Sequence, residues 1–131
     1  MGKVMILLDS DILIDVLRNQ PGAAERLLVL SESESLAVGT VTQMELIVGC
    51  LNLRDLRRVE RLLGGFEIRD LTIEISRRAV ELLREYRLSH GLLLADALVA
   101  ATALINGMPL LTRNQRDYRF IQGLELLPLT E

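Results

Sequence analysis

A short unbroken run of apolar residues that ends in an acid is the feature that most constrains the fold of this chain. Residues 4–8 read Val-Met-Ile-Leu-Leu and are followed by Asp9. Runs of this kind are typical of a strand buried on both faces, as at the centre of a parallel sheet. Residues 10–17 then change to helical spacing, so Asp9 lies where a central strand ends and a helix begins. In open α/β sheets, ligands bind at that edge.

The rest of the chain continues to alternate strands with helices. A solvated loop is expected over the polar residues 31–35 and an edge strand over 66–71. The expected helices and remaining strands are helices 21–30, 42–51, 55–63, 72–90 and 94–105, and strands 36–40, 108–112 and 124–127. Such alternation predicts a parallel α/β sandwich. A chain of 131 residues predicts a single domain spanning 1–131.

Composition narrows the class of protein. Hydrophobic residues make up 50% of the chain and aromatics only 3%, so the core is aliphatic, and the excess predicts a face that needs a partner. The net charge of −3 excludes the basic surface of a passive nucleic-acid binder. The single cysteine, Cys50, excludes an internal disulfide and fits a reducing compartment. With no targeting or membrane-spanning run visible, a cytoplasmic protein without membrane contact is expected.

Four carboxylates share one kind of position, just past a strand or in the first turn of a helix. They are Asp9, Glu45, Asp96 and Asp117. Three of them follow the carboxyl ends of expected strands, which lie on one edge of a parallel sheet, so the side chains can converge. Asp96 is the most informative, because it interrupts an apolar run in which an unpaired carboxylate is costly.

Each acid also has a purely structural interpretation. Thr42-x-x-Glu45 fits a capping box, and Asp9 fits a cap of the first helix. Asn114-x-x-Asp117 fits an N-cap followed by an acid in the first turn. If the carboxylates converge, however, they repel one another by about 1–4 kcal/mol per contact. A divalent cation such as Mg²⁺, which takes oxygen ligands and keeps several waters, offsets that repulsion and suits cleavage of a phosphodiester.

Four motifs follow one another along the chain and together span nearly all of it. They are residues 8–15 (Leu-Asp-Ser-Asp-Ile-Leu-Ile-Asp), Thr42-x-x-Glu45-x-x-x-Gly49, residues 96–103 (Asp-Ala-Leu-Val-Ala-Ala-Thr-Ala) and residues 111–118 (Leu-Thr-Arg-Asn-x-x-Asp-Tyr). In this order and spacing the chain resembles PIN-domain ribonucleases, and more closely the VapC-type toxins of bacterial and archaeal toxin–antitoxin pairs. The resemblance implies a PIN-like three-layer α/β/α sandwich whose central, mostly parallel sheet has four to five strands.

The resemblance also implies an activity and a set of partners. It implies a Mg²⁺- or Mn²⁺-dependent endoribonuclease, homodimeric, acting on tRNA or another structured RNA and inhibited by a small cognate antitoxin. By this matching Asp9 and Asp96 are the metal ligands, and Glu45 and Asp117 complete the acidic quartet. Asn114 remains an alternative to Asp117 for the fourth position.

Other residues near the motifs receive supporting roles. Beside the quartet, the supporting residues are Ser10, Asp11, Thr112 and Asn114, and the candidate phosphate contacts are Arg113 and Arg116. Glu45 or Asp117 would orient or deprotonate the attacking water, and the arginines would attract a polyanion to an acidic site. The chain departs from the family where Asp11 replaces the usual asparagine and Tyr118 the common phenylalanine. Asp15 is expected to be a surface acid, and His90 a helix-end residue rather than a general base.

Two rival interpretations remain open. Asp9-Ser10-Asp11 after an apolar strand also resembles the opening motif of haloacid-dehalogenase-type phosphatases, and Asp70 could be the phosphate acceptor of a receiver domain. Both families need a lysine late in the chain, whereas the only lysine here is Lys3. The other rival is a catalytically silent PIN-like interaction module, which would gain no melting temperature from Mn²⁺.

Overall fold

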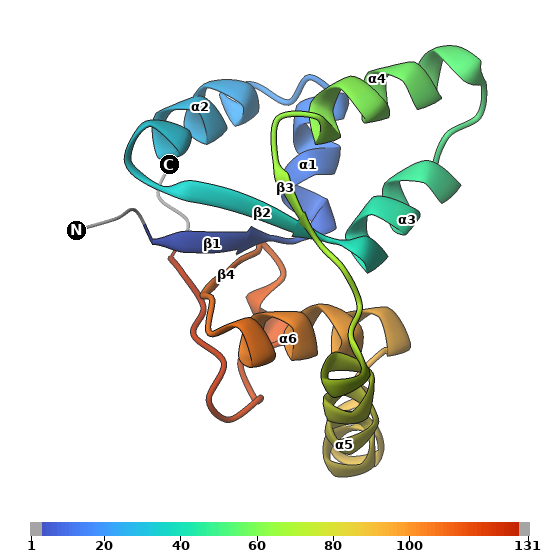
Figure 1. Ribbon diagram of the computed structural model, residues 1–131, viewed down its shortest axis with the longest axis vertical. Helices are drawn as coiled ribbons and strands as arrows, with labels where there is room; N and C mark the ends of the chain where they lie inside the picture. The colour runs from blue at the N-terminus through green and yellow to red at the C-terminus, as the bar shows by residue number, and fades with distance from the viewer. Residues whose placement is uncertain (1–3, 129–131) are drawn as a thin grey trace.

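The computed structural model describes residues 4–128 and contains a four-stranded sheet with helices on both faces (Figure 1). In chain order the elements are β1 (Met5–Leu8), α1 (Ser10–Leu17), α2 (Ala23–Ser33), β2 (Ser35–Gly39), α3 (Thr40–Val48), α4 (Leu53–Leu63), β3 (Glu67–Arg69), α5 (Ile73–His90), α6 (Leu94–Asn106), β4 (Leu110–Leu111) and the 3-10 helix η1 (Gln115–Asp117). The strand order is β3-β2-β1-β4, and every pair is parallel. The predicted three-layer sandwich is confirmed, with β1 inside the sheet and β3 at its edge.

The apolar sequence of β1 reflects two separate cores, one on each face of the sheet. Leu7 packs with residues of α5 and α6, whereas Ile6 and Leu8 pack with residues of α1 to α4. The ribbon shows the same division, with α1 to α4 on one side of the sheet and α5 and α6 on the other (Figure 1). Because successive side chains of a strand point to opposite faces, a strand covered on both sides must be apolar throughout.

Helix α6 is central to the second core, as its sequence predicts. Five of its alanine and valine side chains are buried, namely Ala97, Val99, Ala100, Ala101 and Ala103. Their small size lets the helix lie close to the sheet and to α5. Helix α6 has only 13 residues, and nowhere between residues 4 and 128 is a helix both long and apolar enough to cross a membrane.

Two expected elements differ from the structure. The loop predicted over 31–35 is wrong, because α2 continues to Ser33 and β2 begins at Ser35. The Ser31 and Ser33 hydroxyls donate to carbonyls three residues earlier, so these polar residues extend the helix. The strand predicted over 124–127 is only a single parallel bridge between Leu110 and Leu126, since β4 itself is two residues long and offers no longer edge.

Candidate functional site

The carboxyl edge of the sheet gathers acids from separate segments of the chain. Asp9 follows β1, Glu45 lies in α3, Asp96 lies in the first turn of α6 and Asp117 ends η1. Helices α1 and α3 begin directly after β1 and β2, so these connections leave little freedom in where the acids point. The structure thus brings the four predicted acids to one edge of the sheet.

Burial, and then charges within this group of acids, raise the pKa values of two of its members, Glu45 and Asp96. Desolvation, followed by the charges of Asp9 and Asp96, raises the pKa of Glu45. Burial raises the pKa of Asp96 to about 6, against the lowering effect of a hydrogen bond from Tyr118, and the charges of Asp9 and Asp117 add to the rise. Several negative groups therefore share one poorly compensated region.

Asp9 both caps a helix and faces this acidic region. Its Oδ1 accepts a hydrogen bond from the Ser10 amide at 2.8 Å, which is the N-cap interaction of α1. Its Oδ2 accepts from the Thr112 hydroxyl at 2.9 Å, and Asp9 as a whole residue is 5% exposed. The capping interpretation of Asp9 is therefore confirmed, and it leaves the carboxylate in the cluster.

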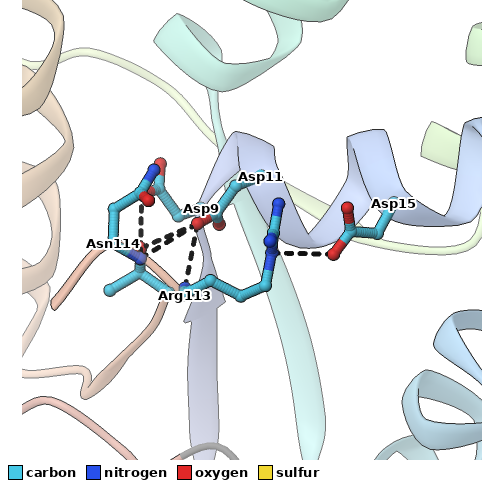
Figure 2. Close-up of polar contacts among 6 residues, drawn as sticks. Asp9, Asp11, Asp15, Arg113 and Asn114 are labelled. Carbon is cyan, nitrogen blue, oxygen red and sulfur yellow. Dashed lines mark hydrogen bonds and ion pairs between the residues drawn. The ribbon is translucent and has the colours of Figure 1, made fainter. Parts of the chain in front are cut away.

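Asp11 ties the loop after β4 to the start of α1 (Figure 2). Its Oδ2 accepts from the backbone amides of Arg113 and Asn114 at 2.9 and 3.1 Å, and from the Thr112 hydroxyl at 3.3 Å. Its Oδ1 is buried and has no hydrogen-bond partner within residues 4–128. Burial, followed by the charge of Asp9, raises the pKa of Asp11. Asp11 thus holds the loop and still adds negative charge beside Asp9.

Glu45 does not form the capping box that the sequence allowed. Helix α3 begins at Thr40, two residues before Thr42, and its N-cap Gly39 has no side-chain cap. Glu45 therefore lies in the second turn, where it lines a cavity of about 250 Å³ between α1, α3 and α4. Asn114 is the N-cap residue of η1 and Asp117 lies in its first turn, as the structural alternative predicted, but the Asn114 side chain makes no capping hydrogen bond.

Arg113 is already engaged by an acid of α1. Its Nε lies 2.8 Å from Asp15 Oδ2 (Figure 2), and the Asp15 side chain is only 15% exposed. The expectation that Asp15 is a surface acid is wrong, because α1 turns its face toward the loop that carries Arg113. Arg116 is exposed and makes no ion pair with any residue that the structure describes.

His90 is the last residue of α5, as the sequence predicted. Its ring stacks on that of Phe120, with 4.3 Å between the ring centroids.

Tyr118 is the residue of this site to which the sequence assigned no role. The residue is 1% exposed, and its hydroxyl donates to Asp96 Oδ1 at 3.1 Å. Burial, and then the charges of Asp9 and Asp96, raise the pKa of the Tyr118 phenol, so the group stays protonated and acts as a donor. The only sequence signal was its departure from phenylalanine in the last motif.

Comparison with known families decides what kind of domain carries this cluster. The model of the PIN domain matches residues 6–122. The chain belongs to the PIN-domain family. Among similar proteins, Ribonuclease VapC10 of Mycobacterium tuberculosis is 40% identical over 122 residues, which cover 92% of this chain and 91% of the relative. Ribonuclease VapC19 of the same organism is 32% identical over 123 residues, covering 92% and 98%.

Solved structures agree with this PIN assignment. A toxin-antitoxin complex from Klebsiella pneumoniae aligns with a TM-score of 0.75 at 31% identity, covering 91% of this chain and 94% of that one. DNA-bound VapBC from Salmonella typhimurium aligns with a TM-score of 0.81 at 24% identity, covering 95% and 97%. The second likeness shows the fold alone.

The oxygen donors of this PIN domain suit a cation that keeps several water ligands rather than one surrounded entirely by protein side chains. Among residues 4–128, no group of three or more Asp, Glu, His or Cys side chains is arranged to hold a metal ion. Mg²⁺ in proteins often takes only one or two carboxylates and keeps its remaining ligands as water. The unpartnered Oδ1 of Asp11 and the raised pKa of Asp96, due first to burial, mark a region that lacks positive charge. The donor set therefore fits a hydrated divalent ion held by two carboxylates.

Proposed function

We propose that this PIN-domain protein, as a single domain over its whole length, is a divalent-metal-dependent endoribonuclease and the toxin of a type II toxin–antitoxin pair. The observation that carries the proposal is the acidic cluster at the carboxyl edge of the sheet, where desolvation and then the charge of Asp9 raise the pKa values of both Glu45 and Asp96. The relatives named as ribonucleases, which match over nearly their full length, support the same activity.

In the proposed site, Asp9 and Asp96 hold the ion, Mg²⁺ or Mn²⁺. When bound, such an ion stabilises the phosphoryl oxygens of an in-line displacement and activates water. Glu45, whose pKa is raised first by desolvation and then by Asp9 and Asp96, accepts the proton of the attacking water. Asp117, whose charge reaches Asp96, orients that water, with Asn114 as the alternative.

An acidic site still has to attract the phosphates of RNA. We assign this role first to Arg116, which is exposed and unpaired with respect to the described part of the chain. Arg113 is the second candidate, because its side chain remains 52% exposed while it pairs with Asp15. Guanidinium groups suit this role, since they bind phosphate oxygens with two parallel hydrogen bonds. A structured RNA, with tRNA among the candidates, is the proposed substrate.

An exposed apolar surface supports the proposed protein partners. Its residues follow one another along α3, the segment after it and the start of α4, and are Met44 at 53%, Val48 at 83%, Leu51 at 91% and Leu53 at 58% exposure. A soluble protein seldom leaves such residues together without a partner. We propose that a cognate antitoxin and a second copy of the chain bury apolar surface of this kind, and that the complex resides in the cytoplasm.

The test is RNA cleavage by purified protein freed of any antitoxin. We expect cleavage of structured RNA with Mg²⁺ or Mn²⁺ and none in EDTA. Asp96→Asn should reduce cleavage at least about 1,000-fold, because it removes a charged ligand of the ion. Glu85→Gln, a matched change of an exposed acid on α5, should cut as the parent does. If Asp96→Asn cuts as fast as the parent, the site is misassigned.

The second candidate function is a PIN-like module that binds partners without cleaving. It is favoured by the lack of a ready three-ligand group within residues 4–128. Metal binding separates the two functions, because a ligand that binds only the folded state raises the melting temperature. The nuclease should therefore gain melting temperature with Mn²⁺, whereas the silent module should not. The phosphatase and receiver interpretations gain no support, since the only lysine of the chain is Lys3.

A further inference from the structure

We propose that the Tyr118 hydroxyl is a positioning group for the metal site, which orients the Asp96 carboxylate and thereby raises the affinity for a divalent cation. The proposal rests on the proposed function, because it assumes that Asp96 is a ligand. It goes further in assigning a role to a residue outside the acidic quartet.

The geometry singles out this hydroxyl. It donates to Asp96 Oδ1 at 3.1 Å, and no other hydrogen bond to the Asp96 side chain is present among residues 4–128. The Tyr118 ring belongs to the core that also contains Ala97 and Ala100 of α6, so the hydroxyl approaches Asp96 from a fixed position. The loop that carries it is anchored as well, since Gln115 Nε2 donates to the Leu127 carbonyl at 2.8 Å.

A single hydrogen bond of this kind has a clear consequence for metal binding. A carboxylate that accepts one hydrogen bond still has free lone pairs for an ion, so the donor need not be displaced. Such outer donors fix the orientation of a ligand, and their loss typically lowers metal affinity about 10- to 100-fold. Without the hydroxyl, Asp96 would have to be ordered by the ion itself, at a cost to binding.

Tyr118→Phe isolates the hydroxyl, because phenylalanine fills the same ring volume in the core. The chain also supplies a matched control, since it has only two tyrosines. Tyr86 is buried too, and its hydroxyl accepts a hydrogen bond from the Gln122 amide at 3.1 Å. Tyr86→Phe therefore removes a comparable buried hydroxyl hydrogen bond whose partner is a backbone amide rather than Asp96.

The measurement is the dissociation constant for Mn²⁺, taken from the electron paramagnetic resonance signal of the free ion. We expect Tyr118→Phe to weaken Mn²⁺ binding about 10-fold or more and Tyr86→Phe to leave it within about twofold, as expected when no outer donor is lost. In cleavage assays, Tyr118→Phe should need more Mn²⁺ for half-maximal rate yet approach the parent rate at saturating metal. If the hydroxyl only stabilised the fold, its loss would not raise the Mn²⁺ concentration for half-maximal rate while leaving the rate at saturating Mn²⁺ unchanged.

Two results would overturn the assignment. If the parent binds Mn²⁺ and Tyr118→Phe binds it equally well or more tightly, the positioning role is wrong while the metal site stands. If the parent binds no Mn²⁺, both the metal site and this role are wrong. As a second measurement, Tyr118→Phe should lower the metal-free melting temperature by roughly 4 °C, and this loss should vanish when Asp96 is already alanine. An unchanged loss in the Asp96→Ala background would equally contradict the role.

Discussion

The two halves of the acidic site differ in how their carboxylates are held. One half, which we call the tied half, consists of Asp9 and Asp11 with the loop 112–114. Its carboxylates accept hydrogen bonds from a helix amide, a threonine hydroxyl and two loop amides. The other, the open half, consists of Glu45, Asp96 and Asp117, and among residues 4–128 only Tyr118 donates to any of its side chains.

This difference suggests that the two halves of the site have different roles. The tied half contributes to the fold, because it joins the ends of β1 and β4 to α1. In the open half, Glu45 and Asp96 have pKa values raised first by desolvation and further by neighbouring charges. A protein retains such uncompensated charge when a ligand that it binds supplies the opposite charge. Substitutions of Asp11 and the loop should therefore act mainly on stability, and substitutions in the open half mainly on activity. Substitutions of Asp9, which caps α1 and is also a proposed metal ligand, should affect both.

The largest expected effect is on activity in the open half. Glu45→Gln removes the proposed base and should reduce RNA cleavage about 100- to 10,000-fold, while the melting temperature stays unchanged or rises. Single-turnover cleavage at saturating metal, together with thermal unfolding, measures both. A Glu45→Gln variant that unfolds more easily than the parent and yet cleaves RNA normally would contradict the role of Glu45 in activity.

The next effect is on stability in the tied half. Asp11→Ala leaves the Arg113 amide without its acceptor and the Asn114 amide with only the Thr112 hydroxyl, and it should lower the free energy of unfolding by about 2–4 kcal/mol. Asp11→Asn, which keeps an oxygen acceptor, should lose less than about 1 kcal/mol. Urea unfolding of the two variants checks this. Equal losses for alanine and asparagine would show that the hydrogen bonds do not hold the loop.

A smaller effect concerns the pH dependence of the open half without metal. The pKa of Asp96 is about 6 in the folded protein, chiefly through burial, against an ordinary value of 3.8. Since the folded state binds the proton more tightly, the protonated carboxyl contributes stability at low pH that is lost as the pH rises from about 4 to 6.

Asp96→Asn removes that pH-dependent loss. In EDTA it should therefore raise the melting temperature at pH 7.5 by about 3–6 °C, with a smaller gain at pH 5. Scanning calorimetry of the two proteins at both pH values measures the difference. A gain that is the same at pH 5 and pH 7.5 would rule out an uncompensated charge on Asp96.

The smallest effect is expected at the edge of the tied half. Asp15→Asn breaks the ion pair with Arg113, and because the arginine is largely exposed, the loss should be below about 1 kcal/mol. Freed from this pair, Arg113 becomes more available to phosphate, so RNA should bind as well or slightly better. The affinity for labelled RNA can be measured by fluorescence anisotropy, with and without Asp15→Asn. Both proteins should carry Asp96→Asn, which prevents cleavage during the measurement. Weaker RNA binding would indicate that Asp15 positions Arg113 for its phosphate contact.

The sequence predicted the elements of the fold well because each depends on neighbouring residues. The apolar run before Asp9 placed a central parallel strand, and the alternation of strands with helices placed both outer layers. The loop predicted over the polar segment 31–35 was wrong. Serine is common at helix ends and in loops, but the Ser31 and Ser33 hydroxyls donate to carbonyls of their own helix.

The site was predictable only in part, for a related reason. Acids that follow strands converge through topology, which can be foreseen from the sequence. The partners of those acids depend on packing between segments about one hundred residues apart, such as Asp11 with Asn114. The pair of Asp15 with Arg113 and the contact of Tyr118 with Asp96 belong to this second kind. No periodicity or motif spacing encodes which of these side chains will meet.

The most direct test of the account is a crystal structure of the protein grown with Mn²⁺ and free of antitoxin, with the ion located by its anomalous scattering. The account predicts an anomalous peak at direct-ligand distance from carboxylate oxygens of both Asp9 and Asp96. A peak bound elsewhere, or no peak at this edge of the sheet at a Mn²⁺ concentration that supports cleavage, would contradict it.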